Sequence, residues 1–160
     1  MKAKKLALCG LLTALALVLS YLESLVPLSF SVPGVKLGLP NLAILFALYK
    51  LGFKEAAVIS LIRVLLVSLL FGNVFSLAYS AAGAALALAI MGLLRRSGRF
   101  GTAGVSVAGA VAHNVGQILV AMAVLETGAI AAYLPVLLLT GTAAGVAIGL
   151  VSAVLINRVK

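Results

Sequence analysis

Three polar side chains that can bind a ligand lie close together in one apolar stretch of the chain. His113, Asn114 and Gln117 fall within a segment from about Gly101 to Leu125, which is long enough to cross a bilayer as a helix. At about 100° per residue, Gln117 lies about 40° and Asn114 about 100° from His113, so one helix face carries all three. Polar groups in hydrocarbon are costly unless they are hydrogen-bonded. These residues therefore either tie helices together or face a ligand.

Arg63 is the second candidate for chemistry, because it lies near the middle of another apolar segment. A centrally placed Arg costs about 2.5–3.5 kcal/mol on membrane-insertion scales. By sequence, no acid shares its membrane layer: Glu55 is two turns away, and Glu23 and Glu126 lie at the outer margin. Arg63 either bonds backbone carbonyls or snorkels, or it faces a polar cavity where an anionic ligand supplies the missing charge. The planar guanidinium suits carboxylate and phosphate oxygens, which favours the second interpretation.

Two further residues are expected to reach this site from the outer half of the bundle. Lys36 precedes the second apolar segment, and Asn41 lies near its start, where it either caps the helix or contributes its amide to the site. Lys36 and Arg63 would supply charge, and the neutral residues would fix orientation. No catalytic group, metal site or cofactor is predicted, since Cys9 is alone and no acid lies near His113 in sequence. The predicted substrate-binding residues are Lys36, Asn41, Arg63, His113, Asn114 and Gln117.

The composition places these residues in an integral membrane protein. The chain of 160 residues is 64% hydrophobic and only 9% charged, with a mean hydropathy of +1.31. A water-soluble domain carries far more charge on its surface. The net charge of +9 does not indicate nucleic acid as a partner, because the basic residues form short clusters between apolar segments. We expect the lipid bilayer as the surrounding medium.

The apolar segments predict one all-α domain, residues 1–160, of six transmembrane helices with a short second helix. If all six cross, ten basic residues lie on one side and only Lys36 on the other, with Arg63 inside the membrane. Basic loops mark the cytoplasm, so both termini are expected there. Leaving out the short second segment would scatter the basic loops over both faces. The segments are approximately Leu6–Leu22, Leu37–Tyr49, Glu55–Phe71, Val74–Leu94, Gly101–Leu125 and Tyr133–Ile156.

Small residues at every fourth position predict where these helices pack. Lipid leaves little hydrophobic drive between helices, so close backbone approach must supply the packing. Most of these stripes are expected to pack within the chain, and a stripe that faces outward would dock another membrane protein. The stripes are Gly141, Gly145, Gly149 and Ala153; Gly104, Ala108, Ala112 and Gly116; Ala81, Ala85 and Ala89; and a patchier set at Ala3, Ala7, Gly10 and Ala14.

Three blocks of sequence, in this order, resemble one family of small bacterial membrane proteins. They are Val35–Asn41, the helix that contains Arg63, and Gly109–Gln117 with its His-Asn-x-x-Gln core. The family carries two labels, Gx transporter and heptaprenyl diphosphate synthase component I, and the resemblance covers essentially the whole chain. It implies a bacterial cytoplasmic membrane. The helix number and the long first external loop are also similar to the substrate-binding S components of energy-coupling factor (ECF) transporters. In those proteins an Ala-x-x-x-Ala motif, here Ala3 and Ala7, docks the membrane partner.

The two labels imply different functions, and carboxylate content separates them. Prenyl chain elongation of the common type holds diphosphate through Mg²⁺ ions bridged by clustered Asp, and this chain has no Asp and three separated Glu. It also lacks the Gly-x-x-x-x-Gly-Lys phosphate loop of an ATPase. We therefore expect an S-component-like subunit for uptake of a small anionic or amphipathic molecule, energised by partner ATPase subunits or a gradient. The alternatives are a non-catalytic membrane subunit of polyprenyl diphosphate or quinone biosynthesis, and a purely structural subunit.

The distribution of basic residues makes a topology prediction. A cysteine introduced at Gly34, in the long connection from Glu23 to Lys36 that is either a lid or a simple connector, should react with an impermeant thiol reagent added outside intact cells. A cysteine at Gly98, which lies between Arg96 and Arg99, should be protected from the reagent because this basic loop is expected in the cytoplasm. Labelling of both positions from outside would contradict six crossings.

Overall fold

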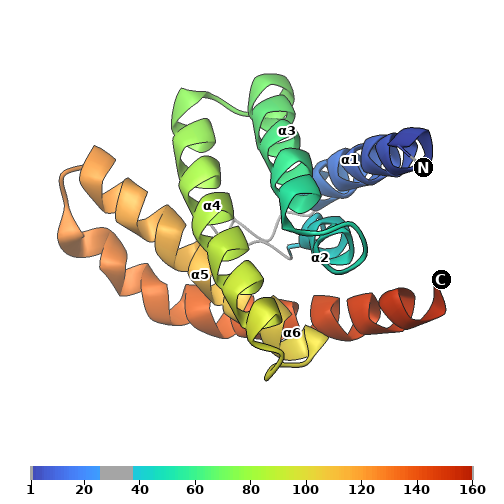
Figure 1. Cartoon of the computed structure of the whole chain (residues 1–160). Helices are drawn as coiled ribbons and strands as arrows, with labels where there is room; N and C mark the ends of the chain where they lie inside the picture. The colour runs from blue at the N-terminus through green and yellow to red at the C-terminus, as the bar shows by residue number, and fades with distance from the viewer. Residues whose placement is uncertain (1, 26–37, 160) are drawn as a thin grey trace.

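The computed structural model of the protein describes residues 2–25 and 38–159, and within those ranges every regular element is a helix (Figure 1). The all-α prediction is therefore confirmed. Gly34 and Lys36, with most of the predicted external loop, lie outside the described residues. The elements are α1 (Lys2–Leu25), α2 (Asn41–Lys50), α3 (Phe53–Phe71), α4 (Val74–Ser97), α5 (Thr102–Val124), the 3₁₀-helix η2 (Gly128–Tyr133) and α6 (Leu134–Arg158).

Four stretches of the described chain are long and apolar enough to cross a membrane: α1, α4, α5, and η2 together with α6. Large apolar side chains on the helices face outward, as lipid-facing residues do; Leu69, Val74 and Leu139 are each more than 70% exposed. The chain is therefore built as a membrane protein. The ten residues of α2 span about 15 Å, half of a hydrocarbon core of about 30 Å, and α3 carries three charged residues. Six crossings and cytoplasmic termini stay predictions.

The short helix α2 lies at the centre of the packing, in contact with α1, α3 and α6 (Figure 1). Its residues from Ala43 to Leu48 are all buried, so it forms part of the core instead of a lipid-facing wall. The turn before it depends on Gly38, whose φ of +71° lies in the left-handed region that glycine adopts without strain. This turn fixes where α2 begins relative to the end of α1.

Two contacts show which helix ends lie together. The Lys5 ammonium pairs with the Glu55 carboxylate, which joins the start of α1 to the start of α3. The Arg95 side chain donates from Nη2 to the Tyr49 carbonyl at 3.1 Å, and its guanidinium lies 5.2 Å from the centre of the Tyr49 ring. The end of α4 is thus held to the end of α2. Because α2 ends where α3 begins, both contacts lie near the connection between these two helices.

Glycines allow α5 to pack closely between α4 and α6. A Cβ atom added at Gly116 would lie 2.9 Å from the Ala82 carbonyl oxygen of α4. A Cβ atom added at Gly149 of α6 would lie 2.6 Å from the Ala103 Cα of α5, and one at Gly145 would be almost as close to the α5 backbone. Such distances leave no room for a methyl group. The glycine stripe predicted along the last helix therefore packs within the chain.

Two other small-residue stripes face outward. The small residues of α1 and of α4 are exposed along their stripes, and a Cβ atom at Gly10 would meet no atom within 4 Å. Docking of a membrane partner on these faces stays a prediction. The exposed positions are Ala3, Ala7, Gly10 and Ala14 in α1, and Ala81, Ala85 and Ala89 in α4.

The contrast between buried and exposed glycines gives a matched stability test. Gly149→Ala should lower the free energy of unfolding by about 1–3 kcal/mol, the usual cost of overpacking, because the α5 backbone must move away. Gly104→Ala is the control, since its new methyl group would only touch the Phe100 side chain at an ordinary 3.7 Å. Thermal unfolding of both variants in detergent measures the difference. Equal stability of the two would show that α5 and α6 are not packed as described.

Candidate functional site

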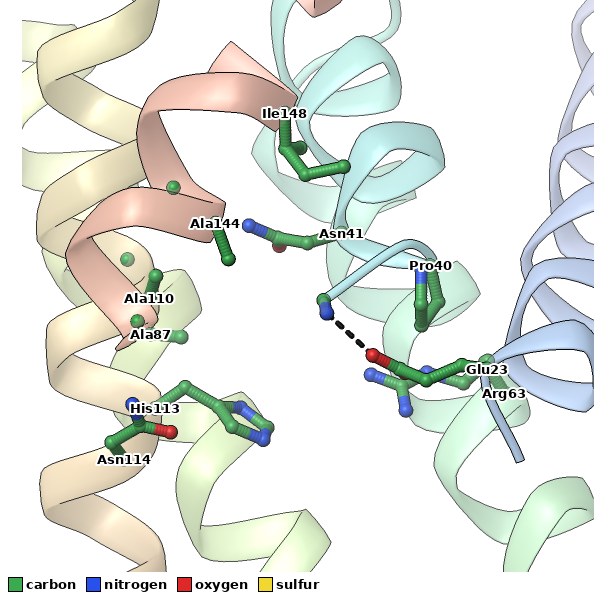
Figure 2. A pocket seen from close by; sticks show the side chains of 14 residues that line it. Glu23, Pro40, Asn41, Arg63, Ala87, Ala110, His113, Asn114, Ala144 and Ile148 are labelled. Carbon is green, nitrogen blue, oxygen red and sulfur yellow. Dashed lines mark hydrogen bonds between the residues drawn. The ribbon is translucent and has the colours of Figure 1, made fainter. Parts of the chain in front are cut away.

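A cavity of about 70 Å³ lies inside the helix bundle and takes wall residues from all six α-helices (Figure 2). This volume holds several water molecules or a small polar group. Five of the lining residues are charged or polar: Glu23, Asn41, Arg63, His113 and Asn114. The other nine are small or apolar: Gly38, Pro40, Ala87, Gly109, Ala110, Gly141, Ala144, Gly145 and Ile148.

Arg63 reaches the cavity from the inward face of α3. Ile59 and Ser60, one turn earlier, are buried, whereas Leu61 and Leu65 are exposed, so the helix presents Arg63 to the interior of the bundle. The Arg63 Nε atom is buried and makes no hydrogen bond to any residue that the structure describes. An unsatisfied buried donor is costly and rare in native proteins. The Arg63 Nε–H is thus a hydrogen-bond donor without a described acceptor, on a side chain that lines the cavity.

Glu23 is the cavity residue that sequence reasoning missed. The Tyr21 and Phe71 rings, 5.4 Å apart, hold the last turns of α1 against the end of α3. This brings Glu23 to the same side of the cavity as Arg63 (Figure 2). The two side chains form no ion pair among the described residues. The Glu23 Oε1 atom accepts a hydrogen bond from the Gly38 backbone N–H at 2.5 Å.

His113 and Asn114 border the cavity from the middle of α5, on the far side from Arg63 (Figure 2). The Asn114 amide nitrogen donates to the Leu137 carbonyl of α6 at 2.6 Å. A side chain at Gly141 would clash with that nitrogen, so the glycine stripe makes this bond possible. Asn114 therefore ties two helices together while it borders the cavity.

Asn41 lies at the start of α2, where sequence left capping and ligand binding open. The N-cap of α2 is Pro40, and no side chain caps the helix there. In Figure 2 the Asn41 amide points into the cavity, towards Ala144 of α6. Asn41 thus does not cap the helix, and its amide is available to a ligand.

The remaining two predicted residues do not join the described cavity. Gln117 lies one turn beyond His113 and is absent from the cavity wall. Its Cγ atom would be only 2.9 Å from a Cβ atom at Gly83, so it packs against α4. Lys36 lies outside the described residues. The structure brings together Asn41, Arg63, His113 and Asn114, and it adds Glu23.

Substitutions at Asn114 and Asn41 distinguish a side chain that holds two helices together from one that faces the cavity. Asn114→Ala should lower the free energy of unfolding by about 0.5–2 kcal/mol, because it removes the hydrogen bond between α5 and α6. Asn41→Ala should change stability by less than about 0.5 kcal/mol, since its side chain caps no helix. Thermal unfolding without added ligand measures both. A larger loss for Asn41→Ala would reverse these assignments.

Comparison with known proteins agrees with the resemblance found in the sequence blocks. Residues 12–155 match the family model described as heptaprenyl diphosphate synthase component I. No curated protein and no solved structure matches the chain. The matched region includes all five polar residues of the cavity wall. Because the match covers most of its length, the chain belongs to the heptaprenyl diphosphate synthase component I family.

Proposed function

We propose that the protein is the substrate-binding subunit of an uptake system in the bacterial cytoplasmic membrane. It binds a small anionic or amphipathic molecule in the cavity between the helices. The observation that carries this proposal is the Arg63 side chain, which lines the cavity with a buried Nε atom that no described residue accepts. Intramembrane cations face cavities or partners because their insertion is costly.

The remaining walls of the cavity support binding of an amphipathic molecule. Polar groups stand at two opposite sides, and small or apolar residues line the space between them (Figure 2). The volume of about 70 Å³ suits the polar end of a molecule more than a whole ligand. The apolar part of such a molecule would extend from the cavity between the helices, where the side chains are apolar. Few convergent polar groups in an apolar pocket are the usual pattern of a small-molecule site.

An uptake role requires energy from outside this chain or from a gradient. The sequence has no phosphate-binding loop, so ATP hydrolysis would belong to a partner subunit. The outward-facing small residues Ala3, Ala7, Gly10 and Ala14 on α1 offer a surface that another membrane helix can approach closely. This arrangement suits the S-component-like role, in which the binding subunit docks through its first helix.

The family description favours a second candidate, a non-catalytic membrane subunit of polyprenyl diphosphate or quinone biosynthesis. Elongation itself would need carboxylates clustered around Mg²⁺. The three glutamates are separated: Glu23 borders the cavity, Glu55 is paired with Lys5, and Glu126 follows α5. In this candidate the chain would hold a prenyl diphosphate at the membrane for a catalytic partner.

A charge-neutral double variant tests the proposed site. Glu23→Gln with Arg63→Gln removes both charges of the described cavity wall, so the ligand-free protein should be as stable as the wild type or more so. Its affinity for the ligand should fall by about 2–5 kcal/mol, the cost of truncating a hydrogen-bonded charge partner. The control, Glu126→Gln with Arg99→Gln, makes the same change of charge outside the cavity.

The measurements are thermal unfolding and native mass spectrometry of the small molecules that co-purify with each protein. Loss of the co-purifying molecule from the double variant alone supports the proposal. Retention of that molecule by the double variant would assign the two charges to structure only. Retention of a prenyl diphosphate by the wild type would favour the biosynthetic candidate. A wild-type protein that neither retains a molecule nor is stabilised by any anionic compound would be a structural subunit.

A further inference from the structure

We propose that the cavity selects a zwitterion, with an acidic group of the ligand on Arg63 and an amino group on Glu23. This inference rests on the proposed function and narrows its substrate class. It starts from the charge of the described wall, which holds one carboxylate and one guanidinium. These two charges cancel, so together the two groups have no net charge to offer an anion.

The two charged side chains lie on the same side of the cavity (Figure 2). No ion pair joins them among the described residues. The Arg63 Nε atom retains an unused N–H, and its planar fork can donate two parallel bonds to a carboxylate. A ligand group can therefore bind Arg63 without first breaking a salt bridge.

Glu23 is held in a position to accept from a ligand. The Gly38 N–H occupies its Oε1 atom, and a carboxylate has further lone pairs on both oxygens. The left-handed conformation of Gly38 fixes that N–H against the end of α1. A charged amino group with three N–H donors matches an acceptor of this kind. The Asn41 amide, which points into the cavity towards Ala144, adds a further donor and acceptor to the wall (Figure 2).

Electrostatics rank the possible ligands. A diphosphate would place two or more negative charges beside the Glu23 carboxylate in a region of low dielectric, where like charges repel strongly. A monoanion on Arg63 would bring a second negative charge to the side of the cavity that holds Glu23, and it would give that carboxylate no cationic partner. A zwitterion satisfies both side chains and adds no net charge to the membrane interior. The expected order of affinity is zwitterion, then monoanion, then diphosphate.

Matched sets of compounds test this order directly on the purified full-length protein in lipid nanodiscs. One set is β-alanine, propionate and propylamine. The other is phenylalanine, 3-phenylpropionate and 2-phenylethylamine, and inorganic pyrophosphate is added to both. Binding is measured by titration calorimetry and by thermal stabilisation. The zwitterion of at least one set should bind about 10- to 100-fold more tightly than its acid and its amine, as expected for one additional charge-assisted hydrogen bond.

The variant Glu23→Gln decides whether Glu23 causes the preference. Gln keeps an oxygen that can accept from Gly38, so the turn before α2 should be preserved. The Glu23→Gln variant should abolish the preference for the zwitterion over the acid. The control variant Glu126→Gln, which removes an exposed charge outside the cavity, should leave this preference unchanged.

Two outcomes would overturn the inference in distinguishable ways. If the acids or pyrophosphate bind more tightly than the zwitterions, and Glu23→Gln strengthens them further, the ligand is a simple anion and the proposed function stands. If no compound of either set binds the wild-type protein, both the zwitterion and the binding function are contradicted.

Discussion

A guanidinium group inside an apolar helix bundle is the constraint on which the arrangement around the cavity depends. Arg63 lies on the inward face of α3, and water is absent from hydrocarbon, so the surrounding protein must supply its counter-charge and hydrogen-bond acceptors. Glu23, near the end of α1, brings a carboxylate to the same side of the cavity (Figure 2), and the Gly38 N–H holds that carboxylate in place. The Arg63 Nε–H still lacks an acceptor among the described residues, and the Arg63 side chain lines the cavity.

The packing that surrounds this group follows from the size of side chains more than from their hydrophobicity. Lipid tails solvate leucine as well as a protein core does, so helices associate where backbones approach closely. In α5, Gly116 meets α4 and the face around Ala103 and Val107 meets the glycines of α6. Many large apolar residues face lipid, and others, such as Leu45, Leu48 and Ile59, form a buried core around α2 and α3. Small residues are concentrated where α5 meets α4 and α6, and several of them also line the cavity.

The sequence predicts what depends on local pattern and fails on what depends on long-range placement. The helices, the short second helix and the packing of Gly145 and Gly149 within the chain follow from spacing and composition alone. Glu23 was expected at the outer margin, because nothing local reveals that α1 ends beside α3. Angular position grouped Gln117 with His113, but Gln117 is one turn further along and packs on α4, which a helical wheel does not show.

Three wall glycines of the cavity are also points of helix contact. Gly109 lies against Met91, Gly141 against Asn114, and Gly145 against the α5 backbone, and all three line the cavity. A larger residue at Gly145 would press on the α5 backbone at Val107, whereas at Gly109 or Gly141 it would meet a side chain, that of Met91 or Asn114. At each of the three positions the added atoms would also take space from the cavity. The volume of the cavity is therefore tied most rigidly to helix packing at Gly145, where backbone meets backbone.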